Sequence, residues 1–574
     1  MPSGGDSSAL TRLGMTMAPR EHGHLACKNG FAEDPPSTVP FLCRVSPRSG
    51  RIRFGKRYFF YAPGVAFRLA KTLSDGSFWD ASPRTEEIKT RTASKARRRG
   101  WEKKKQRSRE KQRRFEREEE EEQMAEFPND PRLKLSEAGL RGVVGETFLP
   151  PLVCGMAAAF AAGRGEGALA LGRDTRHSGP MLLDLVASSF RSVGRDVIDL
   201  GICPVPTIEF FVRSEGLPGG IDVTASHNPP EWNALKFIGE GGYFLDREEA
   251  LAIRRIFERG IPWQAYDRLG RRIADDTAAR RHITRILEVV DVELIRSKHF
   301  RVAIDCVNGS ASLMTPRLLE ELGCEVVAIH TTPDAGFPHP PEPRPAHLED
   351  LSRAVRESGA VIGFAQDPDA DRLALVADGG ECLSEEYTLV LAAEHVLSRK
   401  PGRPVVGNLS GSRMLEDVAA RYNSPCYRTR IGEINVSKKL REVNGAIGGE
   451  GNGGVMIPEV HEGRDSFTGI ALILEMMAER DALPSELVRE IPSYSMLKFQ
   501  KEMEPEAIGA ALERIEEEMG TGAEKDHQDG VKLSWSDRWL HARASNTEPI
   551  IRVMLEAPTE AAARELLERA VALL

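Results

Sequence analysis

The sequence predicts an α/β protein built from three similar mixed α/β domains and a smaller α+β C-terminal domain. After Met124, short apolar runs alternate with amphipathic segments of helical length, which is the pattern of α/β layers. This pattern recurs three times, and each recurrence closes with two apolar runs that enclose a polar loop. The tail departs from the pattern, so we expect a different and smaller domain there.

The three predicted units share one order of elements. An apolar run of strand length leads into an amphipathic helix, and in the first two units a second strand follows. These strands and helices are, in order, 167–174, 179–190 and 196–202, then 301–310, 313–323 and 324–330, then 404–412 and 413–422. The closing pairs of apolar runs lie within 219–238, 360–378 and 445–460. Three units would therefore present three polar loops.

The tail reads as an α+β domain with a fourth loop between Arg543 and Pro549. Thr559 has the side chain and position of a helix N-cap for the last helix. The other predicted elements are a strand at 495–503, a helix at 506–519, a hairpin through 532–545 and a strand at 549–557. We place the four domain limits at 132–275, 276–383, 384–490 and 491–574.

Composition excludes several classes of protein. A formal net charge of -8 is too mild to indicate a nucleic-acid or membrane partner. The 8 cysteines lie far apart and form no C-x-x-C pair, which favours reduced thiols and a cytoplasmic location. The longest apolar stretch, 151–162, is shorter than the roughly 18 residues of a membrane span. We therefore expect no membrane association.

Residues 1–123 lack sustained periodicity, and we predict a low-complexity segment that is disordered or belongs to a mis-assigned start. Lys and Arg make up more than half of residues 95–114. This run could be a nucleic-acid arm, but base-stacking aromatic residues are nearly absent around Trp101, which favours a solvated charge run. Glutamates 118–122 directly precede Met124, and GAG-rich codons there would resemble a bacterial ribosome-binding site. Our hypothesis is that translation begins at Met124.

The loop DPDADR has the composition of a magnesium site. Asp367, Asp369 and Asp371 alternate with Pro368 and Ala370, so that a tight turn can direct three carboxylates at one cation. An exposed acidic turn would have the same composition. The two flanking apolar runs, however, hold this loop at strand ends, which favours metal binding.

Ser226 lies in TASHNP, where Asn228 and Pro229 favour a turn that exposes the hydroxyl. An acyl-transfer enzyme would need a G-x-S-x-G elbow, which this segment lacks. A phosphate carrier needs only positioning and charge neutralisation, which an aspartate-bound metal could supply. Ser226 is therefore a candidate carrier of phosphate.

GEGNGG contains a formal G-x-G-x-x-G pattern, but VMIP follows it, and Pro458 opposes the helix that a dinucleotide site requires. We reject a dinucleotide site and expect Glu450 and Asn452 to contact sugar hydroxyls. In RASNTEP, a cluster of hydrogen-bond donors suits a phosphate dianion. These donors are Arg543, Ser545, Asn546 and Thr547.

In order and spacing, from about Leu140 to the C-terminus, the four loops resemble the α-D-phosphohexomutase family, which comprises phosphoglucomutases, phosphomannomutases and phosphoglucosamine mutases. The resemblance implies four domains around a central cleft, with a phosphoserine at Ser226. It also implies Mg²⁺ held by Ser226, Asp367, Asp369 and Asp371. Asn452 and Gly454 replace the serine and histidine of many bacterial members, so GEGNGG is most similar to the archaeal-type phosphoglucosamine mutases.

Weaker matches complete the set of residues that the resemblance implies. Arg141 in LRGVVG and Lys236 in NALKF resemble general acid/base helpers, and His227 is either a proton shuttle or an orienting hydrogen-bond donor. The expected substrate-binding residues are Arg372, Gly432, Glu450, Asn452, Arg543, Ser545, Asn546, Thr547 and Arg552.

The expected activity is the interconversion of hexose 6-phosphate and hexose 1-phosphate through a phosphoserine and a hexose 1,6-bisphosphate, which also serves as primer. Glucosamine phosphate is the preferred substrate, and phosphomannomutase/phosphoglucomutase activity is the alternative. Other possibilities are a sugar phosphatase and an inactive mutase scaffold with a nucleic-acid-binding basic arm. The expected partners are small sugar phosphates, and the expected assembly is a monomer or homodimer.

Overall fold

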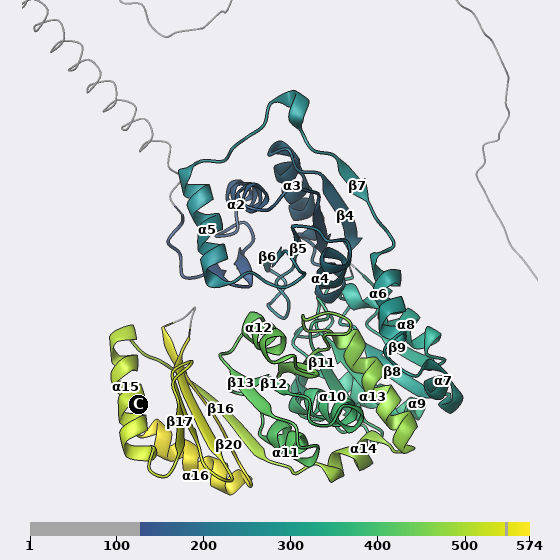
Figure 1. The fold of residues 1–574 in the computed structure, drawn as a ribbon, viewed down its shortest axis with the longest axis vertical. Coiled ribbons are helices and arrows are strands. Elements are labelled where there is room, and N and C mark those ends of the chain that lie inside the picture. The colour runs from purple at the N-terminus through teal and green to yellow at the C-terminus, as the bar shows by residue number, and fades with distance from the viewer. Residues whose placement is uncertain (1–126, 334, 546–548) are drawn as a thin grey trace, which may run out of the picture. The chain divides into compact units, whose positions relative to one another are not determined.

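The computed structural model describes residues 127–333, 335–545 and 549–574 (Figure 1). Every described residue belongs to one compact unit, within Arg97–Leu574. The predictions for residues 1–123, for the basic run at 95–114 and for Met124 as a start therefore lie outside the described residues. Among the residues that are described, no helix is both long and apolar enough to cross a membrane.

The first domain is built on a seven-stranded mixed sheet. The strands lie in the order β1 (Lys134–Ser136), β2 (Gly139–Val143), β6 (Trp232–Gly239), β5 (Gly219–Val223), β3 (Leu169–Arg173), β4 (Val197–Ile202) and β7 (Arg272–Ala274). Its helices are α2 (Pro150–Ala162), α3 (Gly179–Ser192), α4 (Val205–Ser214) and α5 (Arg247–Arg259). The apolar run at 151–162 is thus the buried helix α2, whose residues from Met156 to Ala161 are fully buried.

The second domain has a four-stranded sheet in the order β11 (Leu373–Ala377), β10 (Ile362–Gln366), β8 (Arg301–Asp305) and β9 (Glu325–Ile329). Its helices are α6 (Ala278–Leu287), α7 (Val292–Lys298), α8 (Thr315–Glu321) and α9 (Glu349–Ser358). The third domain has the order β13 (Cys426–Thr429), β12 (Val405–Asn408), β14 (Ile447–Glu450) and β15 (Gly454–Met456). Its helices are α10 (Glu386–Arg399), α11 (Met414–Arg421), α12 (Glu433–Val443), α13 (Ser466–Arg480) and α14 (Pro484–Leu487).

The three sheets repeat one topology. In each of them one strand (β3, β8 or β12) pairs in parallel with both neighbours, and one of these neighbours forms an antiparallel pair with the strand that follows it in the chain. Those antiparallel pairs are β5 with β6, β10 with β11, and β14 with β15. The prediction of three related units, each closed by two strands around a polar loop, is confirmed.

The fourth domain is a five-stranded antiparallel sheet with two helices (Figure 1). The strand order is β16 (Ser495–Glu502), β20 (Ile550–Ala557), β19 (Trp539–Ala544), β18 (Val531–Ser534) and β17 (Glu524–Asp526). The helices are α15 (Pro505–Met519) and α16 (Glu560–Val571), and the Thr559 hydroxyl accepts a hydrogen bond from the Ala562 N–H at the start of α16. The predicted α+β tail and its N-cap are confirmed.

Two predicted strands were too long. The strand predicted at 301–310 ends at Asp305, because Val307 and Asn308 adopt left-handed backbone angles that end the extended run. The strand predicted at 404–412 ends at Asn408, whose side chain accepts a hydrogen bond from the Ser410 N–H in a turn. In both places the apolar run continues into a turn that packs against the protein interior.

The second and third domains share one apolar core, whereas the first and fourth have cores of their own. Leu373 of the second sheet, Val455 of the third sheet and Phe467 of α13 are all buried in the shared core. The six described cysteines are free, as expected: Cys154, Cys203, Cys306, Cys324, Cys382 and Cys426.

Candidate active site

Ser226 lies in the loop between β5 and β6 and has a left-handed backbone, with φ of 50°. The Ser226 N–H donates to the Thr224 hydroxyl at 3.0 Å, and that hydroxyl donates to Asp174 at 2.6 Å. Buried Arg176 donates to the carbonyls of Ser226, Asn228, Pro229 and Trp232. One guanidinium therefore holds the whole loop, and this support offsets the strain at Ser226.

The three aspartates of DPDADR are fully buried in the turn between β10 and β11. Ala370, between two of them, has φ of 58°, which closes the turn tightly. Ligand oxygens of Asp367, Asp369 and Asp371 all lie within 4.8 Å of one another. The Ser226 hydroxyl donates to Asp367 Oδ2 at 2.7 Å, so the serine of the first domain meets the acidic turn of the second.

Two buried cations face this acidic turn. Lys236 Nζ lies 2.6 Å from Asp369 Oδ2 and 3.1 Å from Asp371 Oδ2. Arg464 donates to Asp371 Oδ2 at 2.6 Å, and its other nitrogens reach Glu433 at 2.9 Å and Glu450 at 3.1 Å. The planar guanidinium of Arg464 thus connects the acidic turn to the GEGNGG loop.

The carboxylates of the turn differ in their electrostatics. Burial and the neighbouring Asp369 and Asp371 carboxylates raise the pKa of Asp367 well above its usual range. Burial alone would also raise the pKa of Asp371, but Arg464, Lys236 and Arg372 hold it below its usual value. Burial favours the neutral amine of Lys236, yet Asp369 and Asp371 raise its pKa, so the lysine remains a cation.

His227 is uncharged at neutral pH. Burial, together with the positive charges of Arg372 and Arg141, lowers the pKa of His227 to about 2. Its Nδ1 lies 3.3 Å from the Ser226 hydroxyl oxygen. A neutral imidazole at this distance can orient the hydroxyl or exchange a proton with it, which are the two roles that the sequence left open for His227.

The acidic turn fits a hard divalent cation. Among the described residues, Asp369 Oδ1 and Asp371 Oδ1 are buried side-chain oxygens without a hydrogen-bond partner. Three carboxylates lie within reach of one ion, and the Ser226 hydroxyl adds a fourth oxygen. Oxygen-only donor sets of this kind suit Mg²⁺. The donor chemistry therefore agrees with the metal ligands expected from the sequence.

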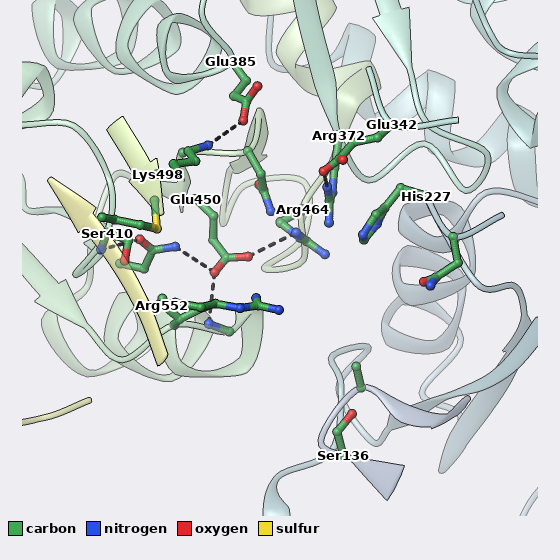
Figure 2. A pocket seen from close by; sticks show the side chains of 18 of the residues that line it. Ser136, His227, Glu342, Arg372, Glu385, Ser410, Glu450, Arg464, Lys498 and Arg552 are labelled. Carbon is green, nitrogen blue, oxygen red and sulfur yellow. Dashed lines mark hydrogen bonds and ion pairs between the residues drawn. The ribbon is translucent and has the colours of Figure 1, made fainter. Parts of the chain in front are cut away.

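A cavity of about 800 Å³ extends from this region and is lined by all four domains (Figure 2). The sequence-predicted residues in its wall are Arg141, His227, Arg372, Gly432, Glu450, Asn452, Arg543 and Arg552. Ser226, Lys236 and the three aspartates are at most 3% exposed and lie behind that wall. This buried group contacts the wall residues His227, Arg372 and Arg464. Asn546 and Thr547 lie outside the described residues.

Close packing explains the glycines of GEGNGG. A Cβ on Gly451 would lie 1.9 Å from Glu386 Oε1, and one on Gly454 would lie 2.3 Å from Arg464 Cδ. Gly453 has φ of 86° and passes close to the backbone of Leu373. The loop is followed by the strand β15, so the prediction that no helix begins here is confirmed.

Glu450 is the fixed centre of the GEGNGG end of the cavity. Its carboxylate accepts hydrogen bonds from Asn408 Nδ2 at 2.9 Å, from the Gly432 N–H at 3.0 Å and from Arg464 (Figure 2). Gly432 and Glu450, which the sequence placed in separate motifs, therefore meet. Asn452 lies in the cavity wall, two residues farther along the loop.

Arg543 of β19 and Arg552 of β20 are paired residues in the fourth sheet, and both line the cavity. Lys498 of β16 adds a third cation to the same wall. Burial lowers the pKa of Arg543, but the group stays a cation at neutral pH because its usual pKa is 12.5. This end of the cavity suits a phosphate group.

Sequence reasoning missed several residues of the site. Sequence reasoning did not identify Arg464, although it directly precedes Asp465, the N-cap of α13. Glu342, which pairs with Arg372 at 3.1 Å, and Lys498 carried no local signal, because only tertiary packing brings them to the cavity. Asn408 and Ser410 likewise line the wall from the end of β12.

Comparisons with known proteins give a consistent picture. The four models of the phosphoglucomutase/phosphomannomutase family match in order, with alpha/beta/alpha domain I at residues 132–262, domain II at 280–380, domain III at 384–494 and the C-terminal domain at 498–573.

Two curated relatives match over nearly their whole length. A Methanopyrus kandleri protein named "Probable phosphoglucosamine mutase" is 35% identical over 434 residues, which cover 75% of this chain and 95% of the relative. A Thermococcus kodakarensis protein named "Phosphoglucomutase/phosphomannomutase" is 38% identical over 445 residues, covering 76% and 97%. A crystal structure of a phosphoglucomutase/phosphomannomutase family protein from Burkholderia thailandensis has a TM-score of 0.68 and 28% identity, covering 76% of this chain and 98% of that one.

Proposed function

Because this chain belongs to the α-D-phosphohexomutase family of intramolecular phosphotransferases, we propose that it interconverts glucosamine 6-phosphate and glucosamine 1-phosphate through a phosphoserine at Ser226. The observation that carries this proposal is the 2.7 Å contact between the Ser226 hydroxyl and buried Asp367, beside a cavity with arginines on its opposite side. A serine held in this way is positioned to carry phosphate and lacks the relay of an acyl-transfer enzyme.

In the proposed reaction, phospho-Ser226 transfers its phosphoryl group to the free hydroxyl of a bound hexose monophosphate. A bond forms between that hydroxyl oxygen and phosphorus, the bond from phosphorus to the serine oxygen breaks, and the proton of the sugar hydroxyl passes to a basic group of the site. The resulting 1,6-bisphosphate turns over in the cavity and returns its other phosphoryl group to Ser226. The net result is exchange between the 1-phosphate and the 6-phosphate.

Charge neutralisation is the task of the buried cations. Lys236 keeps its charge beside Asp369 and Asp371, which favours an electrostatic role over that of a general base. Arg141 donates to Asn228 at 2.5 Å and faces the cavity, where it can contact phosphoryl oxygens. Mg²⁺ is assigned to Asp367, Asp369, Asp371 and Ser226, and when bound it would offset negative charge on the transferring group.

Contacts at the end of the cavity away from Ser226 align the substrate. Arg543, Arg552 and Ser545 are assigned to the phosphate that does not react, and Glu450 and Asn452 to sugar hydroxyls. All of these except Ser545 line the cavity wall. Energy gained at these remote contacts holds the reacting hydroxyl in place. The fixed carboxylate of Glu450 is an acceptor, which suits a hydroxyl or a protonated amine on the sugar.

The choice of sugar has two candidates, because the two relatives carry different names. The preference for glucosamine phosphate rests on the GEGNGG loop and on the name of the Methanopyrus kandleri relative. Phosphomannomutase/phosphoglucomutase activity is the alternative, and the 38% identity to the Thermococcus kodakarensis relative supports it.

The test is phosphorus NMR of the full chain with Mg²⁺, a trace of hexose 1,6-bisphosphate and, in turn, glucosamine, glucose and mannose 6-phosphates. Conversion to a 1-phosphate that is absent in Ser226→Ala supports the proposal and ranks the sugars. Release of inorganic phosphate in excess of the 1-phosphate would instead indicate a sugar phosphatase. Mutase activity that survives in Ser226→Ala would overturn the assignment of the phosphoserine.

A further inference from the structure

A second group of metal-ligating side chains lies in the second domain, apart from the acidic turn. It consists of Asp305, His330 and His339, whose ligand atoms all lie within 4.8 Å of one another. Asp305 is the last residue of β8, and it pairs in register with Ile329, the last residue of β9. His330 follows directly, and His339 lies farther along the segment that leaves β9. The topology thus brings all three to one edge of the sheet.

Contacts to both of its oxygens hold the carboxylate of Asp305 in place. Its Oδ1 accepts a hydrogen bond from the Val307 N–H at 2.8 Å. Its Oδ2 lies 2.9 Å from His330 Nδ1 and 3.1 Å from His339 Nε2. In a tetrahedral site with metal–ligand bonds of about 2.0–2.1 Å, neighbouring ligand atoms lie about 3.3 Å apart. The two oxygen–nitrogen distances are therefore close to the spacing that a single ion requires, and the two nitrogens lie within 4.8 Å of each other.

The outer nitrogen of each imidazole also faces an oxygen. His330 Nε2 lies 3.6 Å from Asp350 Oδ2, and His339 Nδ1 lies 2.9 Å from the Pro340 carbonyl. A neutral imidazole has only one N–H, so it can donate to one of its two oxygens and turns a lone pair toward the other. If a cation sits between the inner nitrogens and Asp305, each outer N–H can donate to its oxygen. Histidine ligands in metal sites are commonly held in this way.

The backbone around the group is also fixed. His330 and Asn308 both have left-handed angles, with φ of 49° and 55°. The Asn308 N–H donates to the His330 carbonyl at 2.6 Å, and its side chain bonds to the Thr332 N–H and the Gly336 carbonyl. Strained residues held by such a network indicate a functional position. The side chains of His330 and His339 remain 21% and 15% exposed, which leaves a route from solvent.

We propose that Asp305, His330 and His339 bind a divalent transition-metal ion, with zinc as the representative, and that this ion fastens the segment after β9 to the sheet. Two imidazoles and one carboxylate form a donor set for Zn²⁺ and its neighbours, whereas Mg²⁺ prefers oxygen alone. The same segment carries Glu342, which pairs with Arg372 in the cavity wall. The ion would stabilise the support of that wall without contacting the substrate.

The rival state is a metal-free group in which His330 and His339 share the Asp305 carboxylate through hydrogen bonds. Burial alone would lower the pKa of His339, but the hydrogen bond and negative charge of Asp305 raise it. The two states differ in one measurable property, because only the first binds zinc at neutral pH with one ion per chain.

The experiment is a calorimetric Zn²⁺ titration of the full chain, freed of metal by a chelator and then held in excess Mg²⁺ so that oxygen-only sites are occupied. Wild type is expected to bind one equivalent, and His330→Ala and His339→Gln are expected to weaken binding at least about tenfold. Glutamine at 339 keeps a donor for Asp305, so this variant tests ligation with the hydrogen bond preserved. His347→Ala, on the same segment but outside the group, is the matched control and should bind as wild type does.

Co²⁺ in place of Zn²⁺ gives a second measurement. A four-coordinate site with two imidazoles should give a visible absorption band that is much stronger than that of six-coordinate Co²⁺ among oxygens, and His339→Gln should lack it. Zinc binding of equal strength in wild type and His339→Gln would overturn the proposal, as would the absence of any bound equivalent in wild type. Either result would leave the metal-free hydrogen-bonded group as the state of these three residues.

Discussion

The two ends of the cavity differ in burial and in how firmly their side chains are held. At the end formed by the first and second domains, Ser226 is 3% exposed and Asp367, Asp369 and Asp371 are fully buried. At the other end, Lys498 is exposed and Arg543 and Arg552 are half-buried. The buried end contains closely spaced carboxylates and strained backbone, whereas cationic side chains line the open end. The difference agrees with the roles proposed above, the chemical step at the first end and capture of the substrate at the second.

The largest expected effect lies at the buried end. Asp367→Ala removes the partner of the Ser226 hydroxyl and one of the three carboxylates assigned to the metal, so kcat should fall on the order of 10³-fold. The folded state should persist, because the substitution also relieves the repulsion that raises the pKa of Asp367. Activity assays and thermal unfolding without Mg²⁺ would test both parts. A variant that loses activity because it unfolds would contradict the second part.

Arg464 contacts carboxylates at both ends of the cavity, and we expect the second largest effect from Arg464→Lys. Lysine can approach only one of the carboxylates that the guanidinium contacts, which are Asp371, Glu433 and Glu450. We expect kcat/KM to fall about 10²-fold, with contributions from both kcat and KM. Arg441→Lys, an exposed arginine that pairs with Glu462, is the control. If only KM changed, Arg464 would belong to the capture end alone.

At the open end the expected effect is smaller and of another kind. Arg543→Ala removes one cation from the cavity wall, and Arg552 and Lys498 remain nearby. KM for the sugar phosphate should rise about tenfold while kcat changes by less than about threefold, because the lost contact is made equally in the ground and transition states. Steady-state kinetics would decide this. A fall in kcat as large as that of Asp367→Ala would remove the distinction between the two ends.

The last prediction concerns stability and pH. Burial raises the pKa of Glu386 to about 8, against a usual value of 4.5, so the folded state binds more protons than the unfolded state between these pH values. Its contribution to stability is therefore fully present below about pH 4.5 and is lost as pH rises towards 8. Glu386→Gln keeps an acceptor for the Ser412 N–H and removes the titration.

The measurement is chemical unfolding of wild type and Glu386→Gln from pH 5 to pH 8.5. The variant should gain stability relative to wild type as pH rises, and the two should converge near pH 5. A difference that is independent of pH would show that Glu386 does not titrate in this range.

Site residues that lie in contiguous loops could be predicted from the sequence, whereas residues that reach the site from distant parts of the chain could not. Ser226 and the three aspartates lie in short motifs whose turns and flanking strands could be anticipated. In the structure the Ser226 hydroxyl donates to Asp367, and the ligand oxygens of the aspartates lie within 4.8 Å of one another. Arg464 and Glu342 reach the site only because separate sheets and loops pack together, and neither has a local pattern that shows its partners. The early end of the strand at Asp305 was missed for a related reason, since left-handed backbone at Val307 leaves no trace in an apolar run.

The shared core of the second and third domains limits how this chain could be recombined with its relatives. An exchange of the second domain alone would cut through apolar contacts that include Leu373, Val455 and Phe467, and both halves would have to repack. The fourth domain has its own core, and its family match begins at residue 498, shortly after the third ends at 494. A chimaera joined between these residues would combine the fourth domain of a relative, with its cationic residues, with the first three domains of this chain. Affinity for the phosphate assigned to Arg543 and Arg552 could thus change through this domain, while the GEGNGG loop and the acidic turn stay intact.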